Sequence, residues 1–164
     1  MEKKLTVLSM ILIVLCIIFG SSIYYLTHAH QDLKGIACEA NAKFTYVNDL
    51  DNASAPMDIR LVLKMHYVFF TSNKGIMTLN GVASSGGKQF FVSRNVNFTY
   101  VAQDDFYKFQ YGNEQRSVRD TLPSEVYSYF FNSESNLYHI NYLDKDTLMF
   151  SSVYAPMFIC NVKS

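Results

Sequence analysis

Residues 36–47, with the sequence IACEANAKFTYV, alternate between small or apolar side chains and polar side chains. Ile36, Cys38 and Phe44 fall on one parity, whereas Glu39 and Lys43 fall on the other. A period of two is typical of a β-strand that buries one face and leaves the other in water. Antiparallel sheets accommodate strands of this kind. The stretch therefore predicts an amphipathic strand in an antiparallel sheet.

The same alternation continues along the chain, interrupted by short turns such as SNKG, SSGGK and QDD. Short connections favour successive hairpins, so we expect a meander of six to eight strands. In the last stretch, Pro156 indicates a bulge or an edge position, because proline cannot donate to the ladder. The further strand candidates are residues 57–71, 76–83, 89–102, 106–112, 136–143 and 147–162.

One segment departs from this pattern, residues 119–133, RDTLPSEVYSYFFNS. Ser124 or Asp120 could cap a helix there, and Pro123 suits a first helical turn. Val126 and Phe130 lie one turn apart. We therefore predict a short helix of two or three turns that covers one end or face of the sheet. The fold class is mainly β with a minor α component, as a strongly bent sheet or a small barrel whose first and last strands meet.

The composition of the 164 residues suits a folded β domain that does not bind nucleic acid. The chain carries 14 basic and 14 acidic residues, so it has no charge excess to attract a polyanion. It holds 13 Phe and 12 Tyr, which favours strands and a packed core over disorder.

Near the N-terminus, residues 5–26 form an uncharged apolar run, LTVLSMILIVLCIIFGSSIYYL. A helix of this length spans a bilayer core of roughly 30 Å. Lys3 and Lys4 precede the run, and basic residues favour the cytoplasmic side of a membrane. The sequence therefore predicts a cytoplasmic segment at 1–4 and a signal anchor in the bilayer at 5–26. A linker at 27–35 and an exported domain at 36–164 follow. The alternatives are a cleaved signal peptide and lipoprotein processing at Cys16.

The other two cysteines, Cys38 and Cys160, lie in the first and last predicted strands. An oxidising compartment and an even exported count favour a structural disulfide between them. Two buried free thiols or a redox pair are the alternatives, although no CxxC spacing is present. A zinc site would need further ligands, and His66 and His139 stand on separate strands.

Catalytic motifs are not found in the sequence. The chain has no P-loop, GxSxG, HExxH or SxxK pattern, and its carboxylate pairs fall at predicted turns. We therefore expect neither an enzyme nor a cofactor. Two weaker possibilities remain: His66 and His139 could respond to mild acid, and aromatic side chains lining a barrel could hold a small apolar ligand, although a packed core is the alternative.

The layout of the chain resembles that of the FidL-like family: a short basic N-terminus, one anchor and a β-rich domain. The residues that carry the resemblance are IACEANAKF at the start of this domain, GIMTLNGVA within it and MFICNV at its end. Members of the family are small enterobacterial inner-membrane proteins, and the layout is also similar to ToxS-type companions of membrane-anchored regulators.

The resemblance implies a single-pass accessory protein of the bacterial inner membrane, with its C-terminal domain in the periplasm. It also implies that this domain binds a membrane-anchored winged-helix transcriptional regulator and stabilises or modulates it. Tyr138, Ile140 and Tyr142 share one face of a strand and are the candidate partner surface. The alternative function is a stand-alone envelope protein that binds a small apolar ligand or assists the assembly of a surface structure.

Overall fold

The computed structural model describes residues 10, 12–21, 32–47, 58–131 and 136–163. The chain divides into two compact units, residues 1–31 and residues 32–164. In the first unit, residues 12–21 are helical. Within the described residues, no helix is both long enough and apolar enough to cross a membrane. The predicted cytoplasmic segment at 1–4 lies outside the described residues, as do parts of the predicted anchor at 5–26 and linker at 27–35.

The second unit, the barrel domain, is a closed barrel in which each strand pairs antiparallel with the next and β8 returns to β1. The predicted antiparallel barrel, its meander order and the meeting of the first and last strands are thereby confirmed. The final predicted stretch, 147–162, forms two strands rather than one, and Pro156 begins the second of them. The strands are β1 (Ala37–Val47), β2 (Asp58–Thr71), β3 (Lys74–Ser85), β4 (Lys88–Gln103), β5 (Phe106–Arg116), β6 (Asn136–Asp144), β7 (Thr147–Ser151) and β8 (Pro156–Val162).

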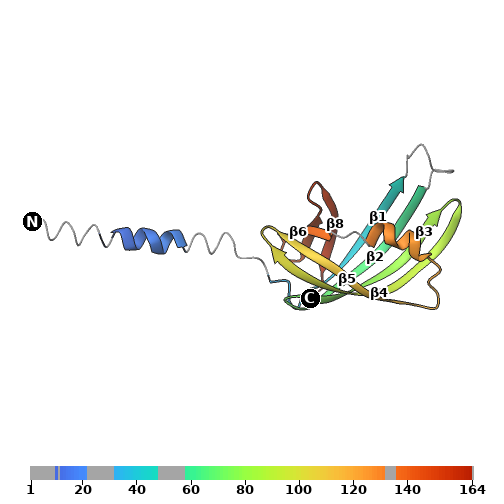
Figure 1. Ribbon diagram of the computed structural model, residues 1–164, viewed down its shortest axis with the longest axis horizontal. Coiled ribbons are helices and arrows are strands. Elements are labelled where there is room, and N and C mark those ends of the chain that lie inside the picture. Colours follow the sequence, from blue (N-terminus) through green and yellow to red (C-terminus); the bar gives the residue numbers. More distant parts are fainter. Residues whose placement is uncertain (1–9, 11, 22–31, 48–57, 132–135, 164) are drawn as a thin grey trace, which may run out of the picture. The chain divides into compact units, whose positions relative to one another are not determined.

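The strands differ in length, and this difference shapes the barrel. The strands β1–β5 have 11 to 16 residues, whereas β6, β7 and β8 have nine, five and seven. As a result, β8 pairs with β1 only from Cys38 to Ala40, and β6 pairs with β5 only from Tyr107 to Phe109. We call the part with these pairings the closed half. Beyond it, β1–β5 continue as a curved sheet, which we call the open half (Figure 1).

The helix α2 (Ser124–Phe131), orange in Figure 1, packs against the open half. The ring centre of Phe130 lies 6.1 Å from that of Phe44 on β1, and Phe131 lies 6.4 Å from Tyr111 on β5. The helix thus reaches both outer strands of the curved sheet and covers its inner face. The predicted short helix is confirmed, and the carbonyl of Pro123 accepts its first hydrogen bond, from Tyr127 N–H at 3.1 Å.

The barrel domain starts at Asp32, four residues before the predicted boundary. Leu33 is buried in the core, with 1% of its surface exposed. Gly35 has a φ of +80°, a conformation that glycine adopts without steric cost, and its N–H donates to the carbonyl of Phe69 at 2.7 Å. These contacts make residues 32–35, which belong to the predicted linker, part of the folded domain.

The predicted disulfide is present between Cys38 and Cys160, whose Cα atoms lie 5.4 Å apart. Both cysteines are fully buried, and they sit where β1 meets β8. The bond joins residues that are 122 positions apart in the sequence, so it encloses nearly the whole barrel domain in one loop.

Replacing both Cys38 and Cys160 by serine should lower the free energy of unfolding by about 4–5 kcal/mol, because the unfolded chain then gains the entropy of a long open loop. Urea unfolding of the full chain in detergent measures this loss, and Cys16→Ser is the control that should change nothing in the barrel domain. Alkylation of Cys38 and Cys160 in the absence of reductant would contradict the disulfide.

Candidate functional site

A buried arginine, Arg94, holds the connection between β5 and α2 against the barrel wall. Arg94 lies on the inward face of β4, and its side chain has no exposed surface. Its guanidinium donates to both carboxylate oxygens of Asp120 at 2.9 and 3.0 Å, to Glu114 Oε2 at 2.9 Å and to the carbonyl of Leu122 at 2.6 Å. The guanidinium carbon also lies 4.4 Å from the ring centre of Tyr127 on α2.

Asp120, the partner of Arg94, is equally buried and accepts further hydrogen bonds. Donors to its carboxylate are the N–H groups of Ser93 at 2.9 Å and Leu122 at 3.1 Å, together with Arg116 Nη2 at 3.2 Å. Burial alone would raise the pKa of Asp120, but these hydrogen bonds and the charge of Arg94 outweigh it and hold the pKa below its usual range.

This ion cluster has a structural role, because its charges are matched within the protein. The prediction that Asp120 could cap the helix is wrong: its carboxylate faces Arg94, and the helix begins after Pro123. The cluster positions α2 without offering an unpaired group for chemistry.

The aromatic side chains of the closed half pack on one another. Ring centres are 4.7 Å apart for Phe150 and Phe158, 5.3 Å for Tyr67 and Phe150, and 5.1 Å for Phe98 and Phe109. Such separations are typical of stacked and edge-to-face aromatic pairs in a core. The predicted aromatic lining thus serves as packed core here.

Three tyrosines carry hydroxyl groups into this core. The hydroxyl oxygens of Tyr111 and Tyr138 lie 3.2 Å apart, and the buried Tyr67 side chain interacts with both of these tyrosines. Burial raises the pKa of Tyr67, Tyr111 and Tyr138. These hydroxyls therefore stay protonated at neutral pH and act as hydrogen-bonding groups rather than as bases.

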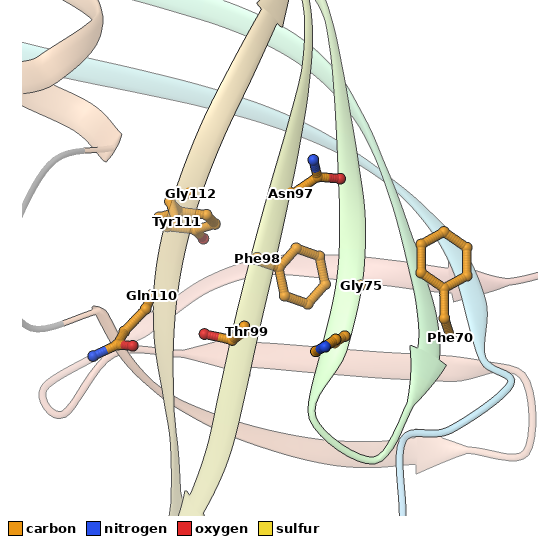
Figure 2. Close-up of a pocket in the computed structure, with 9 residues that line it drawn as sticks. Phe70, Gly75, Asn97, Phe98, Thr99, Gln110, Tyr111 and Gly112 are labelled. Carbon is orange, nitrogen blue, oxygen red and sulfur yellow. The ribbon is translucent and has the colours of Figure 1, made fainter.

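A hollow of about 420 Å³ opens over β3, β4 and β5, and Figure 2 shows the residues around it. Gly75 and Gly112 both line it. The ring of Phe98 lies where a Cβ on Gly75 would stand, so position 75 must remain glycine. The other lining residues are Phe70, Lys74, Asn97, Thr99, Gln110 and Tyr111. None of the lining residues is acidic, a histidine or a cysteine.

An exposed apolar row crosses the outer face of the open half. Val62 on β2 lies opposite Val82 on β3, which in turn lies opposite Phe91 on β4. Their exposed fractions are 50%, 42% and 64%. Lys43 stands opposite Val62 at one end, and Arg119 joins Phe91 in lining a hollow at the other. We call Val62, Val82 and Phe91 the outer apolar row.

The two predicted pH-responsive histidines are not brought together. His66 pairs with Glu39 and Thr78 on neighbouring strands, whereas His139 Nδ1 lies 3.0 Å from Asn141 Nδ2. Within the described residues, no group of three or more His, Cys, Asp or Glu side chains could hold a metal ion.

The predicted partner surface on β6 needs correction. Tyr138 and Ile140 have exposed fractions of 8% and 4%, because this face of β6 points into the core. Tyr142, at 37%, is exposed near the end of the strand. The face that carries these three residues is therefore mainly core rather than surface.

Sequence reasoning missed Arg94 and the outer apolar row. Arg94 interrupts the inward parity of β4, between Val92 and Val96, and a charge at such a position requires a buried partner. Phe91 and Val82 lie on the outward parity, where polar residues are expected. Both exceptions are visible in the sequence once the inward parity is known.

Replacing Arg94 by methionine should lower the free energy of unfolding by about 3–5 kcal/mol, because the buried Asp120 carboxylate loses its two hydrogen bonds from Arg94 and keeps only the half-exposed Arg116 as a cation. The matched control is Arg60→Met, which breaks the exposed Arg60–Asp58 pair and should cost less than about 1 kcal/mol. Urea unfolding of the two variants compares these losses; equal losses would refute the structural role of the cluster.

The lowered pKa of Asp120 also predicts a pH dependence. The stability that its ionised carboxylate supplies is present above the ordinary carboxyl pKa of about 3.9 and is lost as the pH falls through the lower pKa of the folded state. Asp120→Asn should therefore weaken the acid dependence of the urea midpoint below about pH 4. An identical acid dependence in the variant and the wild type would contradict this assignment.

Comparison with known proteins gives one family. Residues 81–160 match the family described as "FidL-like putative membrane protein". No curated protein matches the chain. The matched residues run from within β3 to within β8, so they include Arg94, Asp120, α2 and Cys160. The resemblance to the FidL-like family that the sequence predicts is confirmed over these residues.

Proposed function

We propose that the chain is a non-enzymatic accessory protein of the bacterial inner membrane. Residues 5–26 anchor it, the N-terminus stays in the cytoplasm and the barrel domain lies in the periplasm. There, the barrel domain binds a membrane-anchored winged-helix transcriptional regulator and stabilises or modulates it.

Three observations support the location. The matching family is described as a membrane protein, and the run 5–26 has the composition and length of an anchor. The buried Cys38–Cys160 disulfide agrees with an oxidising compartment such as the periplasm.

The outer apolar row is the observation that carries the binding function. Its three side chains are neighbours on adjacent strands, and each is about half exposed. Burying such a row against another protein is favourable, since apolar surface gains roughly 25 cal/mol per Å² when it leaves water. Contiguous exposed apolar surface marks interaction sites in soluble domains.

The charge balance of the chain favours a protein partner over a nucleic acid. Arg60 is paired with Asp58, and Lys64 and Lys163 are both paired with Glu39. Paired cations attract a phosphate backbone weakly, and the chain has no net charge. The alternative, binding of a small apolar ligand, has less support because aromatic rings pack together in the closed half.

A co-purification experiment tests the proposal. The full chain and the full-length regulator are expressed together and extracted from membranes, and the regulator should co-purify with the chain. Deleting residues 36–164 should remove this interaction and change the level or output of the regulator. If the wild-type chain binds no regulator and the deletion changes neither level nor output, the accessory function is wrong.

Variants of the outer apolar row locate the contact. Phe91→Ser and Val62→Ser should each weaken regulator binding about tenfold, because an interface residue that matters contributes more than about 1 kcal/mol. Val101→Ser is a matched control, since Val101 lies on the same strand as Phe91 and is also 64% exposed. Equal affinities of the three variants, measured by titration of the purified proteins, would exclude the row from the interface.

A further inference from the structure

The strand β1 has an edge that no other described strand pairs with. Its pairing with β8 ends at Ala40, yet β1 continues to Val47. Over residues 41–47, the ladder to β2 occupies one side of the strand. No described strand pairs with the other side over residues 42–47. We call this side of residues 42–47 the open edge.

Two hydrogen bonds establish which backbone groups point to the open edge. The carbonyl of Ala37 accepts from Lys163 N–H at 2.8 Å, on the side of β8. The carbonyl of Ile36 accepts from Phe69 N–H at 2.9 Å, on the side of β2. Because successive residues of a strand direct their backbone groups to opposite sides, Lys43 and Thr45 direct theirs to the open edge.

The side chains next to this edge differ between its two faces. On the outer face, the exposed side chain of Lys43 forms no ion pair within the described part of the chain, whereas its neighbours Lys64 and Arg60 do. On the inner face, the rings of Phe44 and Phe130 are in contact but remain partly exposed. An added strand would thus meet a cation on one side and aromatic rings on the other.

We propose that the open edge of β1 accepts an extended segment of the partner protein as an additional strand. The segment has about five to seven residues, with apolar side chains at alternate positions over Phe44 and Phe130 and a carboxylate near Lys43. This inference rests on the proposed function and specifies how the partner is bound. The added strand continues the row that runs from Lys43 through Val62 and Val82 to Phe91.

The charge on Lys43 favours a different protein over a second copy of this chain. Symmetric pairing centred on Lys43 would place this lysine opposite its own copy, and like charges directly opposite each other are destabilising. A lysine on a free edge also discourages edge-to-edge aggregation. A partner carboxylate converts the same charge into an attraction.

Proline substitutions at the open edge test the proposal, because proline lacks the N–H that an added strand needs. In Lys43→Pro and Thr45→Pro, the lost N–H points away from β2, so the ladder between β1 and β2 keeps its hydrogen bonds. The control Lys43→Ala removes the charge and keeps the N–H. The probe is the purified exported domain of the regulator, titrated against the full chain in detergent.

We expect each proline variant to lower the affinity at least tenfold, and Lys43→Ala to lower it only a few-fold. Absence of binding to the wild-type chain would overturn the proposed function itself. Binding to the wild type with unchanged affinity in both proline variants would overturn strand addition alone. Self-association of the wild-type chain that the proline variants abolish would instead assign the edge to a second copy.

Amide hydrogen exchange decides the question if a proline variant does not fold. In the wild-type chain, the N–H groups of Lys43 and Thr45 should exchange more slowly once the regulator domain is bound. The N–H groups of Ala42 and Phe44, which face β2, serve as internal references. Unchanged exchange at Lys43 and Thr45 in the complex would contradict the proposal.

Discussion

The barrel depends on a short junction between its first and last strands. Only three residues of β1, from Cys38 to Ala40, pair with β8. A ladder of this length offers few hydrogen bonds, each of which contributes about 1 kcal/mol to net stability. The disulfide at the same place adds a covalent link and removes entropy from the unfolded chain. The junction therefore holds because a covalent bond and a short ladder coincide.

The short junction also explains why the two halves of the domain have different cores. Aromatic side chains fill the closed half, whereas a helix covers the inner face of the open half. In the closed half, rings from strands all around the barrel pack together. In the open half, β6–β8 do not reach, and α2 covers the inner face of the sheet instead. The buried pair of Arg94 and Asp120 fixes the segment that leads into this helix. A buried ion pair is costly to form, so its value here lies in fixing one position for α2.

Much of the fold could be predicted from the sequence, because alternation over long strands such as residues 57–71 defines both the strands and their inward faces. The pairing of Cys38 with Cys160 followed from their compartment and number. The open half could not be predicted, since it depends on where β8 diverges from β1, which no local pattern specifies. The surface predicted at Tyr138 and Ile140 was wrong for another reason: both lie on the apolar parity of β6, and this face points into the core.

The open edge of β1 links the architecture to the proposed function. A sheet edge that pairs with no described strand, beside an outer apolar row, is suited to binding another chain. The most direct test is amide hydrogen exchange of the wild-type chain alone. We predict fast exchange at Lys43 and Thr45, with slow exchange at Ala42 and Phe44, whose N–H groups face β2. Equally slow exchange at all four positions would show that the edge is already paired and would contradict strand addition at β1.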